Sequence, residues 1–169
     1  MRVNTKLTGP CRGWFGRPWI LLAALAVTLS TATGARAAGG ASAESWKASD
    51  LVEVGDFAAG LSKGGEKPVI VYVGFDFLYK SGHIPGALYF GAGRTEEGLA
   101  ALTKWARTAP RGKTIVMYCG CCPWSECPNI RPAFRALRAA GVTNLKLLHI
   151  PDDLLHDWIN HGYPVEKGP

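Results

Sequence analysis

The chain has 169 residues, a length that suits one globular domain. Its hydrophobic share of 47% and charged share of 19% are ordinary for a folded protein and exclude wholesale disorder. Most of the net charge of +6 comes from residues 1–37, which hold five basic side chains and no acidic one. The rest of the chain is close to neutral, so we expect no basic patch and no nucleic acid partner.

Residues 1–37 have the layout of a secretory signal peptide. Basic residues come first, an apolar stretch follows at residues 19–27, and Ala35-Arg36-Ala37 is a small-x-small cleavage signal. The apolar stretch is short for a membrane span, although an uncleaved anchor is the alternative. We expect cleavage near Ala37, a periplasmic or secreted protein without membrane attachment after cleavage, a flexible leader at 38–45 and one domain at 46–169.

The mature chain then alternates helix-like and strand-like stretches. The first half predicts a helix at 51–61 after the cap residues Ser49 and Asp50, a buried strand at 69–73, a turn at 82–86, a short strand at 87–90 and a helix at 96–107. The second half predicts a buried strand at 114–118, a helix that Asn129 caps and Gly141 closes, a strand at 145–148 and a last helix at 152–160.

This alternation predicts an α/β fold with a mainly parallel sheet covered by helices on both faces. Ligands of such folds bind at the carboxyl ends of the strands. The loop at 119–129 follows the strand at 114–118 directly, so it lies at one of those ends.

Cysteine is concentrated in this loop. Cys11 falls in the predicted signal peptide, and the other four are Cys119, Cys121, Cys122 and Cys127. An exported protein meets an oxidising compartment, where structural disulfides usually join distant segments. Four thiols in one loop indicate chemistry more than stapling.

Four segments, in order, resemble the rhodanese-like family: the Gly-His-Ile-Pro-Gly-Ala turn at 82–87, the strand and cysteine at 115–119, the helix end and strand at 139–145, and the closing segment at 157–165. The resemblance covers residues 46–166. It implies the three-layer rhodanese-like fold and a sulfurtransferase that carries sulfane sulfur as a persulfide on the catalytic Cys119. The family also contains modules that lack a catalytic cysteine and only bind partners.

The chain departs from the family pattern in two places. Tyr72, Gly74 and Leu78 occupy the positions where family members usually carry an Asp-x-Arg element and a glutamate. The loop after Cys119 is also longer than a typical six-residue sulfurtransferase loop. The nearest candidates for the family's loop arginine are Arg131 and Arg135, on the following helix.

The position of Cys119 favours a nucleophile and sulfur carrier. A helix N-terminus offers free amides and partial positive charge, which lower the pKa of a nearby thiol and hold anions. Gly120 allows a tight turn beside the sulfur. We expect Gly120, Trp124, Arg131 and Arg135 to form the substrate-binding loop, although solvated charge is the alternative for Arg135.

The remaining thiols leave alternatives open. Cys119 and Cys122 have the Cys-x-x-Cys spacing of a redox-active disulfide, and Cys121 or Cys127 could resolve a persulfide. Four soft sulfurs could also bind copper(I), whereas their crowding on one loop suits tetrahedral zinc poorly. We expect no resident metal and no cofactor. The expected partner is a small sulfur-donor anion or a thiol acceptor, with a protein partner as the alternative.

Overall fold

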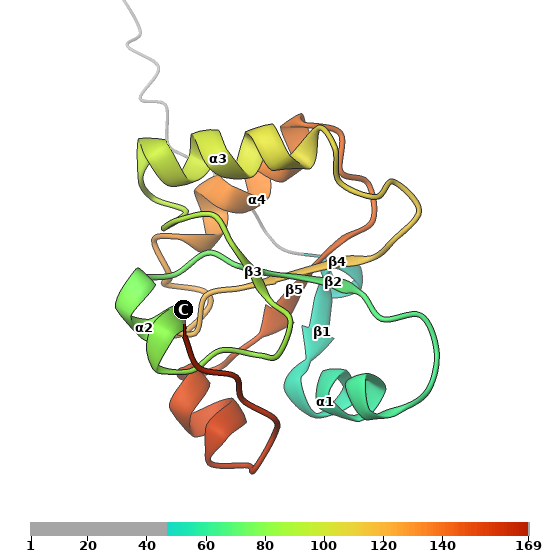
Figure 1. The fold of residues 1–169 in the computed structure, drawn as a ribbon, viewed down its shortest axis with the longest axis vertical. Coiled ribbons are helices and arrows are strands. Elements are labelled where there is room, and N and C mark those ends of the chain that lie inside the picture. Colours follow the sequence, from blue (N-terminus) through green and yellow to red (C-terminus); the bar gives the residue numbers. More distant parts are fainter. Residues whose placement is uncertain (1–46, 169) are drawn as a thin grey trace, which may run out of the picture. The chain divides into compact units, whose positions relative to one another are not determined.

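The computed structural model describes residues 47–168 and places five parallel strands in one sheet, in the order β1-β5-β4-β2-β3 (Figure 1). The strands are β1 (Leu51–Glu53), β2 (Val69–Tyr72), β3 (Leu88–Tyr89), β4 (Ile115–Tyr118) and β5 (Leu145–His149). The helices are α1 (Val54–Ser62), α2 (Asp76–Ser81), α3 (Glu96–Ala106) and α4 (Ile130–Ala139), with a 3₁₀ turn η1 (Ala48–Asp50) and a π-helical turn η2 (Leu155–Ile159).

Helices cover both faces of the sheet, as the sequence predicts (Figure 1). On one face, α3 and α4 pack Leu102, Phe134 and Leu137 against β2, β4 and β5. On the other face, α1 and η2 bring Phe57 and Trp158 against the same strands. The predicted three-layer α/β fold with a parallel sheet is therefore confirmed.

Strand β4 occupies the centre of the described sheet. It pairs in parallel with β2 on one edge, where Tyr72 aligns with Tyr118, and with β5 on the other, where Met117 aligns with Leu147. All four of its residues are buried, and alternate side chains enter the two cores. Cys119 follows this strand directly and therefore lies at its carboxyl end.

The predicted helix at 51–61 is wrong at its start. Leu51–Glu53 is an edge strand, β1, in which Leu51 pairs with Leu147 and Glu53 with His149. The helix begins only at Val54. Long-range pairing with β5 prevails here over local helical spacing, because β5 would otherwise leave one edge without a partner.

Three further differences concern helices. The sequence prediction omits α2, which directly follows β2. The last predicted helix shortens to η2, where the carboxylate of Asp153 accepts a hydrogen bond from the amide of His156 at 2.8 Å. Asn129 precedes α4, but its side chain makes no capping hydrogen bond; it turns instead toward the cysteine loop.

Three predictions concern residues 1–46: the signal peptide, the leader and the start of the domain. These residues lie outside the described part of the chain. Within the described part of the chain, no helix has the length and apolar character needed to cross a membrane.

We expect Tyr118→Phe to destabilise the fold without changing the sheet. The buried hydroxyl of Tyr118 accepts a hydrogen bond from the amide of Ile84 at 2.9 Å, and its loss leaves that amide without this partner. An unsatisfied buried donor costs about 1–3 kcal/mol, so the urea midpoint should fall at an unchanged m-value. Tyr163→Phe, at a partly exposed position, is the control. Equal shifts in both variants would contradict the expectation.

Candidate functional site

The candidate site lies at the carboxyl end of β4, where Cys119 ends the strand. Its side chain is 1% exposed and belongs to the core that β4 shares with α4. The loop at 119–129 leaves this strand end, passes the end of β5 and returns to begin α4 (Figure 1). The loop therefore covers Cys119.

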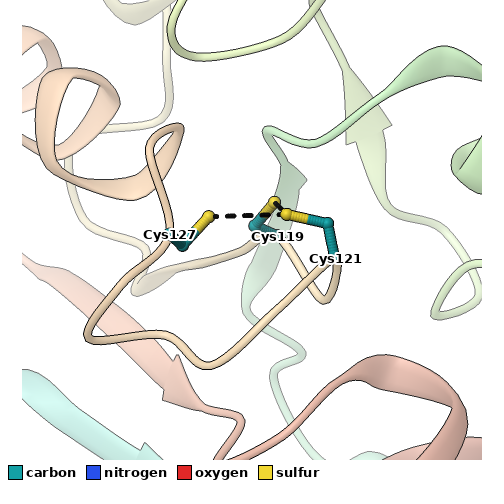
Figure 2. Close-up of side chains that lie close together, drawn as sticks. All are labelled: Cys119, Cys121 and Cys127. Atoms are coloured by element: carbon teal, nitrogen blue, oxygen red, sulfur yellow. Dashed lines mark hydrogen bonds between the residues drawn. The ribbon is translucent and has the colours of Figure 1, made fainter.

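Three thiols of this loop meet in one cluster (Figure 2). The Sγ atoms of Cys119 and Cys121 are 3.2 Å apart, and those of Cys121 and Cys127 are 3.8 Å apart. All three sulfurs lie within 4.8 Å of one another. The Sγ of Cys122 contacts that of Cys121 at 3.1 Å from the outer side. The four cysteines of the loop are free thiols. The hydrogen bonds given above do not join Cys119 directly to Cys122, its partner in the predicted redox pair.

Asn129 is part of this cluster, which the sequence prediction missed. The fully buried side chain donates from Nδ2 to the Sγ of Cys119 at 3.4 Å and to that of Cys121 at 3.9 Å. Its Oδ1 accepts a hydrogen bond from the backbone amide of Arg94 at 3.2 Å. Asn129 thus joins the sulfurs to the segment before α3. The position of Asn129 two residues after Cys127 could have indicated this contact, but the same position also fits a helix N-cap.

Backbone contacts hold the loop in place. Gly120 has a φ of +74°, and a Cβ there would lie 2.7 Å from the Cβ of Leu154. Its carbonyl accepts a hydrogen bond from the amide of Leu154, and the amide of Trp124 donates to the carbonyl of Ile150. The ring of Trp124 meets that of His149 edge-on, with centroids 5.3 Å apart. Gly120 and Trp124 therefore fasten the loop to the segment around the end of β5.

The positions of the family's Asp-x-Arg element are filled differently. A Cβ at Gly74 would lie 2.2 Å from the hydroxyl of Tyr72 and 3.1 Å from the Sγ of Cys119. The Tyr72 hydroxyl donates to the carbonyl of Phe75 at 3.3 Å. No side chain fits at position 74 while Tyr72 holds this place. Leu78, the third of these positions, lies in α2 and packs against the same core as Tyr72, whereas Cys119 belongs to the core on the other face of the sheet.

The two predicted substrate arginines lie on α4. Arg131 donates from Nη2 to the carbonyl of Ser125 at 3.3 Å, so it braces the outer part of the loop. Arg135 is exposed one turn further along the helix. The structure thus gives Arg131 a loop-supporting contact.

The N-terminus of α4 stabilises the thiolate of Cys127 rather than that of Cys119. The pKa of Cys127 is lowered, first by hydrogen bonding with the thiols of Cys119 and Cys121, and also by the backbone amides of Asn129 and Ile130. These amides belong to the start of the helix. The expectation that this helix end lowers the pKa of Cys119 is therefore not met; Cys127 receives the stabilisation.

The other thiols are harder to ionise. The hydrogen bond with Cys121 lowers the pKa of Cys119, but the interaction with Cys127 and burial outweigh it, so the net shift is upward. The pKa of Cys121 is raised by Cys119, by Cys127 and by burial, and that of Cys122 is raised chiefly by burial. The cluster therefore holds one negative charge readily and resists a second.

We expect Asn129→Asp to shift the pH profile of Cys119 alkylation upward. The substitution keeps the acceptor for Arg94 but replaces the donor to sulfur with a carboxylate, which disfavours the thiolate. Alkylation by iodoacetamide, measured on the Cys119 peptide, should slow about tenfold at a fixed pH for each unit of pKa shift. Asn144→Asp, at an exposed asparagine, is the control. An unchanged profile in a folded Asn129→Asp protein would contradict the role of this side chain.

Solved structures match the described fold, whereas no curated protein sequence matches the chain. Protein BH2092 from Bacillus halodurans is 23% identical, with a TM-score of 0.54 over 70% of this chain and 77% of its own. The Alr3790 protein from Anabaena sp. is 20% identical, with a TM-score of 0.53 over 69% of this chain and 82% of its own. A solution structure of the rhodanese-like domain of Alr3790 gives a TM-score of 0.51 at 20% identity, over 70% of this chain and 80% of its own. At these identities the likeness concerns the fold alone.

The family model of the rhodanese-like domain matches residues 53–149. This range runs from the last residue of β1 to the last residue of β5, so it spans the sheet and includes the whole cysteine loop. It covers more than half of the chain, and the chain therefore belongs to the rhodanese-like domain family.

Proposed function

We propose that this protein is a sulfurtransferase that carries sulfane sulfur as a persulfide on Cys119. The observation that carries the proposal is the placement of Cys119 at the carboxyl end of the central strand, with the Sγ of Cys121 at 3.2 Å. A second thiol at this distance turns sulfur transfer into an intramolecular step. The chemistry needs a thiolate and a sulfur donor, and it needs no cofactor.

The first step is attack of the Cys119 thiolate on the outer sulfur of a donor such as thiosulfate. The sulfur–sulfur bond of the donor breaks, sulfite leaves with the bonding electrons, and Cys119 keeps one sulfur as a persulfide. The thiolate becomes available when the proton of Cys119 passes to Cys127, the thiol of the cluster whose pKa is lowered by its hydrogen bonds with Cys119 and Cys121. The donor is then a small anion, as the family resemblance implies.

The second step removes the sulfur through Cys121. Cys119 is almost fully buried, whereas Cys121 is partly exposed, so Cys121 can present the sulfur to an acceptor thiol. Attack on the outer sulfur moves the persulfide to Cys121 and restores the Cys119 thiolate. Attack on the Sγ of Cys119 instead expels hydrosulfide and leaves a Cys119–Cys121 disulfide, which an external dithiol then reduces.

Intact mass spectrometry of the protein, purified without reductant, tests this carrier. Incubation with thiosulfate or with cysteine persulfide should add one sulfur atom per chain, and cyanide should remove it. Cys119→Ser should abolish the gain, because it removes the nucleophile. Cys121→Ser should retain the sulfur on Cys119 longer, and peptide mapping then separates outward transfer from disulfide formation.

The control is Cys122→Ser, in the same loop. The thiol of Cys122 contacts that of Cys121, which in turn contacts that of Cys119. A protein that gains no sulfur from either donor, or gains it equally in Cys119→Ser, is not this sulfurtransferase. Indifference of all four Cys→Ser variants would favour a partner-binding module.

We also propose that the protein works outside the cytoplasm after removal of residues 1–37. The support is the order of basic, apolar and small residues in that segment. Expression of the full chain in a bacterial host should place it in the periplasm, with a mature N-terminus at Ala38. Ala35→Lys should block cleavage, because the site requires small residues. A full-length protein in the cytoplasm with an intact Met1 would contradict export.

A further inference from the structure

The thiol cluster offers an arrangement that sulfur transfer does not require. Transfer between Cys119 and Cys121 needs only two sulfurs, yet Cys127 directs a third one at them from the opposite side of the loop (Figure 2). Cys127 is 2% exposed and Cys119 is 1% exposed. Two of the three converging thiols are thus shielded from water, and the third, Cys121, is partly exposed.

The spacing of these sulfurs matches a three-coordinate metal ion. A metal–sulfur bond of about 2.3 Å places three sulfurs about 4 Å apart around a trigonal ion. The observed contacts are 3.2 Å between Cys119 and Cys121 and 3.8 Å between Cys121 and Cys127, with all three sulfurs inside 4.8 Å. Shifts of well under 1 Å, within the reach of rotamer adjustment, would equalise them.

We propose that Cys119, Cys121 and Cys127 form a trigonal thiolate site for copper(I). Thiolates are soft ligands that select copper(I), zinc and iron–sulfur centres. A structural zinc ion requires four ligands. Among the residues that the structure describes, the metal-ligand group contains these three cysteines and no fourth member. Cys122 contacts Cys121 but does not belong to this group, so it stays outside the triad.

The surroundings compensate the negative charge of three thiolates. The Nδ2 of Asn129 faces both Cys119 and Cys121, so one amide supports two of the proposed ligands. Cys127 lies just before α4, and the backbone amides of Asn129 and Ile130 and the helix dipole favour negative charge at its sulfur. Such outer contacts orient metal ligands and tune the bound ion.

An open depression leads to the cluster. Cys121 and Cys122 line it together with Pro123, Asp152, Asp153 and His156, and no lysine or arginine occurs among the described residues that line it. The carboxylates of Asp152 and Asp153 at the entrance attract a cation. Cys121 can therefore receive copper(I) at the surface and pass it inward to Cys119 and Cys127.

Binding involves no change of oxidation state. One copper(I) ion binds three thiolates, so the copper–thiolate unit carries a net charge of two minus. The protons still bound to the thiols, at most three, are released to solvent. The proposal uses the same sulfurs as persulfide transfer, but it does not depend on that function. Copper(I) and a persulfide on Cys119 would exclude one another.

The test is an anaerobic titration of the reduced, purified protein with copper(I) against the competing chelator bathocuproine disulfonate. We expect one ion per chain, with three sulfur neighbours at about 2.3 Å in X-ray absorption spectra. Loss of an outer-shell partner typically weakens binding 10–100-fold. Loss of a ligand in Cys119→Ser, Cys121→Ser or Cys127→Ser should therefore weaken it more than about 100-fold.

Cys122→Ser is the matched control and should retain the affinity and the three sulfur neighbours of the unsubstituted protein. An equal loss in Cys122→Ser, tighter binding of zinc(II) than of copper(I), or wild-type affinity in the three triad variants would each overturn the trigonal site. Circular dichroism of every variant identifies any that fails to fold, and alanine replaces serine at such a position.

The two proposals fail separately. Cys127→Ser should lose copper(I) binding, whereas Cys119 should still acquire one sulfur from a persulfide donor, only more slowly, because Cys127 takes up the proton of Cys119 but does not carry the sulfur. Copper binding without any persulfide would reject the sulfurtransferase and keep the metal site. Persulfide formation without copper binding would reject the metal site and keep the sulfurtransferase.

Discussion

Strand β4 is paired on both edges and buried on both faces, and the site depends on this constraint. Its neighbours β2 and β5 fix its direction, and its alternating side chains are shared between two cores. The chain can turn only after Tyr118, so Cys119 must lie at the sheet's carboxyl edge. Since α4 packs on one face, the loop has to return across that edge, which folds its other cysteines over Cys119.

Much of the fold can be predicted from the sequence because the central strands are buried on both faces. Such strands appear as continuous apolar runs, and the runs at 69–73, 114–118 and 145–148 correspond to β2, β4 and β5. Edge elements behave differently. Leu51–Glu53 is too short to show a period, and its state depends on β5, far away in the sequence. The short helix α2 likewise has few residues from which to predict it.

The sequence predicts where the reactive thiols lie, but not how they are arranged or that Asn129 joins them. Four thiols in one loop after a buried strand indicate the location of the chemistry, and three of them meet there. Which thiol receives the helix amides depends on where the loop crosses the strand ends. The same holds for Asn129, since its choice between a cap and a sulfur is decided by the approach of Arg94 from another segment. Such contacts leave no local pattern in the sequence.

The packing of Tyr72 beside Gly74 has a consequence for how this branch of the family diverged. The space that an arginine would need at position 74 is taken by a phenol ring and by the Cys119 sulfur. Either substitution alone meets an obstacle: a side chain at 74 collides with Tyr72, and removal of the ring opens a gap in a buried cluster of tyrosines. The two positions are therefore epistatic, and a return to the family's usual pattern requires both to change together.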